Sequence, residues 1–122
     1  MRRILVIDDD GDYTQSIKEL IEADGYEVVI CNNGRDALKM QGLRPIDIIV
    51  TDIIMPEVNG LEVILQVRKS HPSTKIIAIS GGGLIHAMDL LLMAKQLGAS
   101  IVLRKPFGYS LLKTQLKNLN SH

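Results

Sequence analysis

The stretch ILVIDDD (residues 4–10) joins an uninterrupted apolar run directly to three aspartates. Apolar residues without alternating polar ones are typical of a strand that is buried on both faces, as in a parallel sheet. In open sheets of this kind, ligands bind beyond the carboxyl ends of the strands. The stretch therefore predicts a buried parallel strand with an acidic site at its carboxyl end.

Four more apolar runs follow along the chain, at residues 28–31, 46–50, 76–79 and 101–103. Segments with helical spacing of apolar residues separate these runs. We expect the five helices around residues 13–24, 37–42, 57–71, 85–97 and 111–119. The alternation predicts an α/β fold, a five-stranded parallel sheet with helices on both faces. We expect one domain over residues 1–122, with no output domain in this chain.

Composition narrows the class of protein. Hydrophobic residues make up 46% of the chain and aromatic residues 3%, so we expect an aliphatic core. Fourteen basic residues balance fourteen acidic ones, which gives no electrostatic reason to expect binding to nucleic acid or to a membrane. The single Cys31 excludes an internal disulfide and lies in an apolar run, so we expect it to be buried. With no apolar stretch near the roughly 18 residues of a membrane span, these features favour a cytoplasmic protein.

Polar residues follow four of the five predicted strands. They are Asp8 to Asp10, then Thr51-Asp52, then Ser80 with the glycines 81–83, and finally Arg104, Lys105 and Pro106. Because the strands are parallel, we expect these acids, the hydroxyl and the ammonium at one edge of the sheet. Asp47 precedes Asp52 by five residues, roughly 16 Å along a strand, so we expect it at the other edge in a structural role.

Clustered carboxylates raise one another's pKa unless a cation lies among them. Aspartate oxygens are hard ligands, and a partial set of them suits Mg²⁺, which keeps several waters and shares its shell with phosphate. A carboxylate can also attack a phosphoryl group to form an aspartyl phosphate. This edge is therefore chemically suited to magnesium-assisted phosphoryl transfer, with a lysine to offset the charge.

Four motifs resemble the receiver domain of bacterial two-component response regulators, over essentially the whole chain. They are ILVIDDD at 4–10, VTDIIMPEVNGLEVI at 50–64, IIAIS at 76–80 and LGASIVLRKPF at 97–107. The resemblance extends to the chemotaxis regulators of this family. It implies a flavodoxin-like, doubly wound sheet with strand order 2-1-3-4-5 and five helices.

The resemblance also implies roles for the residues of the acidic edge. Asp52 matches the phosphoacceptor. Asp8 and Asp9 match the pair that binds Mg²⁺, with Asp9 the expected direct ligand. Asp52 itself and the backbone carbonyl of Ile54 complete the metal ligands that the family implies.

Ser80 matches the hydroxyl that follows the phosphoryl group when the domain switches, and Lys105 matches the lysine that contacts that group. The family usually has a cis peptide bond before the equivalent of Pro106. Val102 departs from the pattern, because the family usually has Tyr or Phe there, and this puts aromatic-coupled switching in doubt. The glycine run 81–83 is either a hinge or a mobile loop.

We therefore expect a phosphorylatable signalling switch. The resemblance implies a sensor histidine kinase or histidine phosphotransfer protein as donor to Asp52, and a downstream protein target or an output domain that reads the face of the fourth helix, fifth strand and fifth helix. The expected chain is no turnover enzyme on external substrates. Two alternatives remain: a degenerate receiver that binds partners without phosphorylation, and a phosphohydrolase of the haloacid dehalogenase type.

Some residues receive plainer interpretations. The spacing of Asp8, Asp10, Asp12 and Glu19 approaches that of a calcium loop, but Tyr13 stands where the loop needs glycine. We expect Asp10 and Asp12 to favour the start of the first helix, where acids complement the helix dipole. The three histidines (His71, His86 and His122) share no spacing with the acids, and we expect none to be catalytic. The fourth helix is apolar on more than one stripe, which fits either a partner surface or deep packing.

Overall fold

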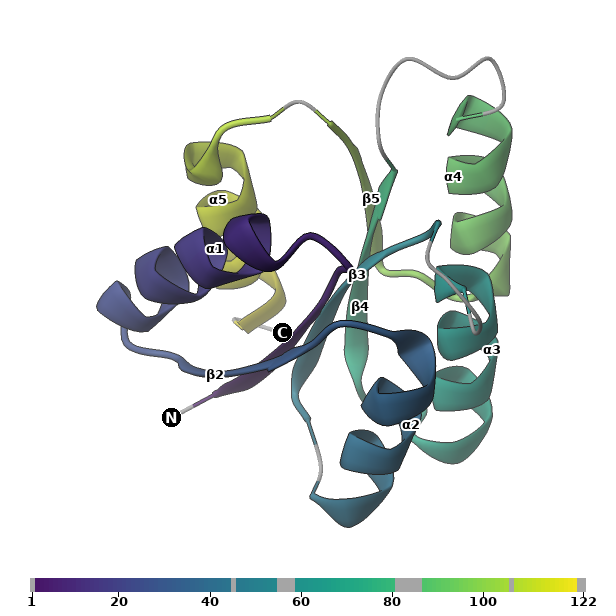
Figure 1. Ribbon diagram of the computed structural model, residues 1–122. Helices are drawn as coiled ribbons and strands as arrows, with labels where there is room; N and C mark the ends of the chain where they lie inside the picture. The colour runs from purple at the N-terminus through teal and green to yellow at the C-terminus, as the bar shows by residue number, and fades with distance from the viewer. Residues whose placement is uncertain (1, 45, 55–58, 81–86, 106, 121–122) are drawn as a thin grey trace.

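Five strands and five helices alternate along the chain in a computed structural model, which describes residues 2–44, 46–54, 59–80, 87–105 and 107–120 (Figure 1). The strands are β1 (Arg3–Ile7), β2 (Glu27–Cys31), β3 (Ile48–Asp52), β4 (Lys75–Ser80) and β5 (Ile101–Arg104). The helices are α1 (Gly11–Ala23), α2 (Gly34–Leu43), α3 (Gly60–Ser70), α4 (Ala87–Leu97) and α5 (Tyr109–Asn120). In this described part, no helix is long and apolar enough to cross a membrane.

All five strands are parallel and pair in the order β2-β1-β3-β4-β5, which confirms the expected topology. The strand order reverses between β1 and β3. Helices α1 and α5 cover one face of the sheet, and α2, α3 and α4 cover the other (Figure 1). The carboxyl ends of β1 and β3 therefore meet at the switch point, where a doubly wound sheet opens a site.

The sheet is buried on both faces, as the apolar runs predicted. Along β1, Ile4 and Val6 belong to one core cluster, and Leu5 and Ile7 belong to the other. Consecutive strand residues point to opposite faces, so an uninterrupted aliphatic run supplies both layers. Full burial of each such side chain contributes about 1.5–3 kcal/mol. Cys31 is buried in one of these clusters, as expected, and burial raises the pKa of its thiol, with a smaller contribution from Asp36.

Side-chain caps set where three helices begin. Each cap is an Asp or Asn whose oxygen accepts a backbone N–H three residues further on; the pairs are Asp10 with Tyr13, Asn33 with Asp36, and Asn59 with Glu62. This satisfies an N–H group that has no partner within the helix. The expected role of Asp10 is thus confirmed, and Asp12 lies in the first turn of α1. The two asparagine caps were not predicted.

Strand β3 begins two residues later than the apolar run suggested. Ile46 is buried but lies outside the strand, because side chains bind its backbone: its N–H donates to Gln41 Oε1, and its carbonyl accepts Thr74 Oγ1. The predicted strand 46–50 is therefore wrong at both ends. The strand extends to Asp52, which is its last residue and does not follow it.

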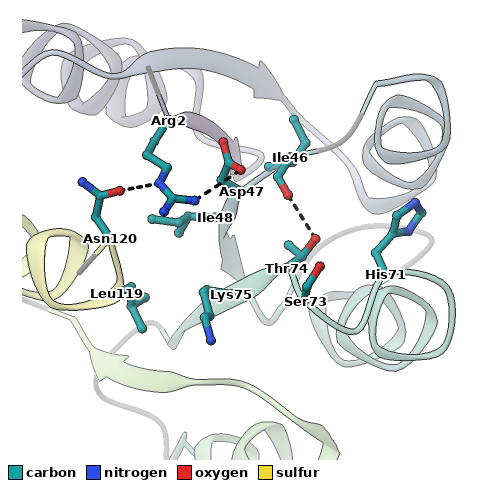
Figure 2. A pocket seen from close by; sticks show the side chains of 10 residues that line it. All are labelled: Arg2, Ile46, Asp47, Ile48, His71, Ser73, Thr74, Lys75, Leu119 and Asn120. Carbon is teal, nitrogen blue, oxygen red and sulfur yellow. Dashed lines mark hydrogen bonds and ion pairs between the residues drawn. The ribbon is translucent and has the colours of Figure 1, made fainter. Parts of the chain in front are cut away.

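Asp47 lies at the amino edge of the sheet, far from the acidic residues, as expected. Its Oδ2 accepts the N–H of Arg3 at 2.7 Å, and its Oδ1 lies 3.6 Å from Arg2 Nη1. Figure 2 shows Arg2 between Asp47 and Asn120, on the rim of a pocket of about 350 Å³. This pocket holds none of the residues predicted to carry function.

Some expectations concern residues outside the described ranges: the glycine run 81–83, the peptide bond before Pro106, the start of the fourth helix, and the histidines His86 and His122. From Ala87 onward that helix is present as α4. Its Leu92 and Met93 are exposed, whereas Ala94 is buried.

Candidate functional site

Three carboxylates lie together at the switch point. Asp8 and Asp9 follow β1, and Asp52 ends the neighbouring strand β3. One oxygen from each of the three lies within 4.8 Å of the others. The predicted clustering of these acids is confirmed, because parallel pairing brings two distant stretches of sequence to one edge.

Asp8 is the buried member of the cluster, whereas Asp9 is exposed. The two oxygens of Asp8 have different partners: Oδ1 accepts the N–H of Asp10 at 3.0 Å, and Oδ2 accepts a hydrogen bond from Lys105 Nζ at 3.1 Å. A buried carboxylate needs such partners, since burial without them is costly. Asp8 therefore connects the three clustered carboxylates to the start of α1 and to Lys105.

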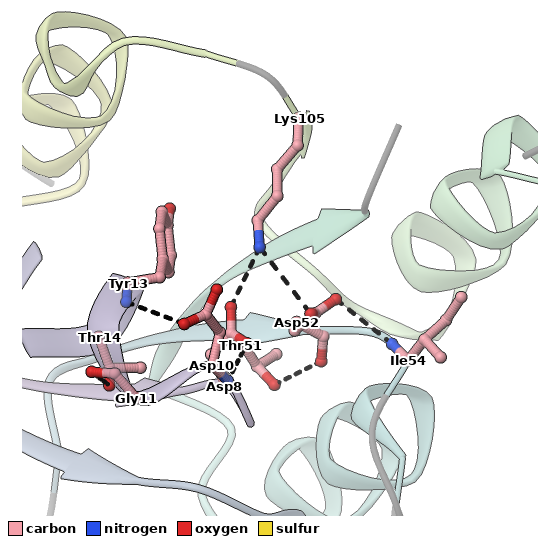
Figure 3. A network of polar contacts seen from close by, with 9 residues as sticks. All are labelled: Asp8, Asp10, Gly11, Tyr13, Thr14, Thr51, Asp52, Ile54 and Lys105. Atoms are coloured by element: carbon pink, nitrogen blue, oxygen red, sulfur yellow. Dashed lines mark hydrogen bonds and ion pairs between the residues drawn. The ribbon is translucent and has the colours of Figure 1, made fainter. Parts of the chain in front are cut away.

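Lys105 reaches the cluster from the end of β5, as Figure 3 shows. Its backbone N–H donates to the carbonyl of Ser80 at 2.9 Å, which continues the β4–β5 pairing beyond the strands. Its Nζ lies 3.1 Å from Asp8 Oδ2 and 4.0 Å from Asp52 Oδ2. Burial alone would lower the pKa of Lys105, but the charges of Asp8 and Asp52 outweigh burial and raise it.

Asp52 is less well compensated than Asp8. Its Oδ1 accepts the N–H of Ile54 at a long 3.4 Å, and Lys105 stands closer to Asp8. Burial, followed by the charge of Asp8, raises the pKa of Asp52, and Lys105 only partly opposes this. Among the described residues, the three clustered carboxylates thus have one ammonium, that of Lys105, beside them.

The donor set fits a hard divalent cation. The three aspartate oxygens lie within 4.8 Å of one another, so one cation between them could contact all three. One of the three side chains is exposed, which leaves room for water ligands, and this combination suits Mg²⁺. The N–H of Ile54 faces Asp52, while the expected role of its carbonyl as a metal ligand stays a prediction.

The backbone behind Asp52 is closely packed. The N–H of Gly60 donates to the carbonyl of Ile53 at 2.7 Å, and the N–H of Ile53 donates to the carbonyl of Ile79. A Cβ at Gly60 would lie 2.2 Å from the carbonyl oxygen of Asp52 and 2.6 Å from Ile53 Cα. Only glycine allows α3 to begin so close to the backbone of Asp52 and Ile53.

Ser80 and Val102 lie further along the same edge. Ser80 is buried at the end of β4, next in sequence to the strand residue that pairs with Asp52. Its expected role in switching stays a prediction. Val102 is partly buried against the core cluster on the face of α2, α3 and α4. The position that usually carries an aromatic ring therefore holds a small aliphatic side chain here.

Tyr13 is a site residue that the sequence reasoning missed. The sequence pattern includes Tyr13 only as part of the first predicted helix, but its ring centroid lies 4.3 Å from Lys105 Nζ. Burial raises the pKa of its phenol, opposed by Lys105. The available signal was its place three residues after the capping Asp10, which puts Tyr13 in the first helical turn beside the acids.

Residues 4–117 match the response regulator receiver domain family, and the chain therefore belongs to that family. Receiver domains of two-component response regulators are phosphorylatable signalling switches. The chain is 37% identical over 108 residues to the chemotaxis protein CheY of Thermotoga maritima, covering 87% of each chain. It is 33% identical over 108 residues to the transcriptional regulatory protein CpxR of Escherichia coli K12, covering 88% of this chain and 44% of CpxR.

Solved structures agree with this family. A crystal structure of a response regulator receiver domain protein from Clostridium thermocellum superposes with a TM-score of 0.89 at 31% identity, covering 98% of this chain and 94% of the other. The chain spans less than half the length of CpxR, so what CpxR does beyond its receiver portion is not carried over. The family favours the receiver interpretation over the haloacid dehalogenase alternative.

Proposed function

We propose that this chain accepts a phosphoryl group on Asp52 from a phosphohistidine of a sensor histidine kinase or histidine phosphotransfer protein, in a reaction that depends on Mg²⁺. The observation that carries the proposal is the position of Asp52, whose carboxylate shares one edge with Asp8, Asp9 and Lys105. A carboxylate among other carboxylates is a useful nucleophile only when cations offset its surroundings.

The reaction is a displacement at phosphorus. An oxygen of Asp52 forms a bond to phosphorus while the bond from phosphorus to the histidine nitrogen breaks, and the nitrogen keeps that electron pair. A bound Mg²⁺ would neutralise charge on the phosphoryl oxygens, and Asp8, Asp9 and Asp52 would hold it. Lys105 would contact a phosphoryl oxygen, and its Nζ lies 4.0 Å from Asp52 Oδ2, which supports this role. Ser80 is the candidate hydroxyl donor.

The product replaces the single negative charge of the Asp52 carboxylate with a phosphoryl group of about −1.5 to −2 at the end of β3, and this biases two preexisting conformations. We infer that the output is read on the face of α4, β5 and α5. Leu92 and Met93 on α4 and Leu111 on α5 are exposed apolar residues that support a protein partner there. The partner is either a downstream protein or an output domain. We also propose that the chain itself binds no nucleic acid, acts in the cytoplasm and turns over no external substrate.

The test is intact mass after incubation with a small phosphodonor such as acetyl phosphate, with and without Mg²⁺. We expect one phosphoryl adduct that requires Mg²⁺ and is absent in Asp52→Asn. The matched control is Asp47→Asn, an aspartate of the same sheet at the opposite edge, which should keep the adduct. An adduct of equal yield in Asp52→Asn would sink the proposal, and sustained release of phosphate from external esters would favour an enzyme.

Val102 supports a second candidate, a degenerate receiver that binds its partner without phosphorylation. In that case, no Mg²⁺-dependent adduct forms, and partner binding is equal for the wild type and Asp52→Asn. The leading proposal requires that acetyl phosphate changes partner binding in the wild type alone.

A further inference from the structure

The start of α1 and Lys105 form a closed circuit of contacts. Asp8 Oδ1 accepts the N–H of Asp10, and Asp10 Oδ1 accepts the N–H of Tyr13 at 3.1 Å. The Tyr13 ring faces Lys105 Nζ at 4.3 Å, and that Nζ returns to Asp8 Oδ2 at 3.1 Å. Figure 3 shows the Lys105 side chain extending down toward the acids, with the Tyr13 ring beside its ammonium. Each member therefore limits the movement of the next.

The ring has little freedom to leave this position. The cap at Asp10 fixes the backbone of Tyr13 in the first turn of α1, and the side chain packs against the core cluster on the face of α1 and α5. An aromatic face attracts a cation within about 6 Å of its centroid. The ammonium of Lys105 ends a flexible four-carbon side chain. A fixed ring that already holds this ammonium reduces the side-chain entropy that Lys105 loses when it contacts a phosphoryl group.

We propose that Tyr13 is a positioning residue for phosphotransfer, whose ring holds the Lys105 ammonium beside Asp8 and within reach of a phosphoryl group on Asp52. The inference deepens the proposed function and rests on it. The lysine stands 4.0 Å from Asp52, close enough to follow a phosphoryl oxygen without leaving the ring. Of the residues described around Lys105, Tyr13 is the aromatic contact, while Val102 supplies no ring at the position where the family usually has one.

A purely structural role for Tyr13 makes a different prediction. If the ring only filled space in the core, Leu and Phe would serve about equally well, and the effect would be independent of Lys105. If the ring acts on the ammonium, Phe and Trp keep the aromatic face and rescue function, whereas Leu does not. Three variants, Tyr13→Phe, Tyr13→Trp and Tyr13→Leu, therefore separate the two roles.

The experiment measures the rate of adduct formation from acetyl phosphate with saturating Mg²⁺, for each variant with and without Lys105→Ala. In the protein that keeps Lys105, we expect Tyr13→Leu to lower the rate of adduct formation at subsaturating acetyl phosphate by about twofold to thirtyfold. This range is the free energy of cation–π contacts converted to a ratio of rates. Phe and Trp should stay within about twofold of the wild type. In the Lys105→Ala background, Tyr13→Leu should change nothing, because a double-mutant cycle isolates the pair.

A second measurement does not depend on activity. Protons of the Lys105 methylene groups near an aromatic face have NMR signals shifted upfield by the ring current. In the Mg²⁺-free protein, we expect that shift in the wild type and in Tyr13→Phe, and its loss in Tyr13→Leu. Thermal unfolding of each variant identifies any that fail to fold.

Equal rates for Leu and Phe, or an undiminished effect of Tyr13→Leu in Lys105→Ala, would overturn the positioning role. Unshifted Lys105 signals in the wild type would overturn it as well. These outcomes differ from failure of the proposed function, in which the wild type itself forms no adduct. A wild type that is phosphorylated on Asp52 with a rate indifferent to residue 13 removes only this inference.

Discussion

The amino and carboxyl edges of the sheet differ in how many cationic partners their carboxylates have. At the amino edge, Asp47 and Glu27 lie among Arg2, Arg3 and Arg44, and each carboxylate has cationic partners within 3.6 Å. At the carboxyl edge, three carboxylates gather around one lysine. In the described part of the chain, each carboxylate named at the amino edge has an arginine of its own, whereas the three clustered carboxylates at the carboxyl edge share one lysine.

This difference separates stability from function. Exposed ion pairs contribute modestly to the free energy of folding, and they need no cation or proton from outside the chain. An excess of buried or half-buried carboxylates costs folding free energy and is relieved by a cation or a proton from outside the chain. The carboxyl edge is therefore where we expect a cation or a proton to stabilise the fold, as a site that responds to its ligands requires.

The largest expected effect tests whether the carboxyl edge is rigid. Gly60→Ala places a methyl group 2.2 Å from the carbonyl oxygen of Asp52. This oxygen belongs to the backbone, so it cannot rotate away as the end of a flexible side chain could. We expect a loss of about 3 kcal/mol in the free energy of unfolding, measured in urea, because overpacking of this kind forces backbone shifts. Phosphorylation should slow as well, since Asp52 moves with its carbonyl.

Gly42→Ala is the matched control, because a Cβ there meets nothing within 4 Å and the residue lies in the last turn of α2. Alanine should be neutral or stabilise by up to about 1 kcal/mol, since it restricts the unfolded chain more than glycine does. Equal losses for both variants would show that the close approach at Gly60 has no special cost.

The next effect tests the amino edge. Asp47→Ala removes the carboxylate that accepts the N–H of Arg3 at 2.7 Å and pairs with Arg2. We expect a loss of about 1–2 kcal/mol in urea unfolding, as for a partly exposed hydrogen bond to a charged group. Asp47→Asn keeps an oxygen acceptor and should lose less. Adduct formation should be unchanged in both, and a slower reaction would contradict the separation of the edges.

Particular residues show which parts of the fold could be predicted from the sequence. The aliphatic runs predicted the strands. Parallel pairing then required Asp8 and Asp52 to lie close together, because Asp8 follows β1 and Asp52 ends the neighbouring strand β3. The run 46–50 misled, because Ile46 is as apolar as a strand residue while Gln41 and Thr74 bind its backbone. Side-chain hydrogen bonds between distant residues leave no local pattern.

The arrangement within the site was harder to predict than its membership. Two adjacent acids have the same chemistry, but Asp8 is buried against Lys105 and Asp9 is exposed, since neighbouring residues leave a strand in different directions. The place of Tyr13 beside Lys105 depends on how α1 begins after the cap at Asp10. Periodicity identifies a helical face, but it does not decide which strand end that face meets.

The smallest expected effect has the opposite sign from the others. Asp52→Asn should stabilise the Mg²⁺-free protein near neutral pH by roughly 1 kcal/mol, the scale of partly exposed charge interactions. The fold raises the pKa of Asp52 above its ordinary 3.8, chiefly by burial and then by Asp8. The folded protein therefore favours the protonated form.

The pH dependence follows from that sign. The contribution of Asp52 to stability is fully present below its ordinary pKa of 3.8 and is lost as the pH rises through its higher pKa in the folded state. The advantage of Asp52→Asn over the wild type should consequently be near zero at the acid end and grow toward neutral pH, in urea unfolding at each pH. Mg²⁺ should stabilise the wild type more than the variant, because binding to the folded state alone adds to stability. An Asp52→Asn protein that is less stable than the wild type without Mg²⁺ would mean that Lys105 already compensates the cluster, and the two edges would then be equally balanced.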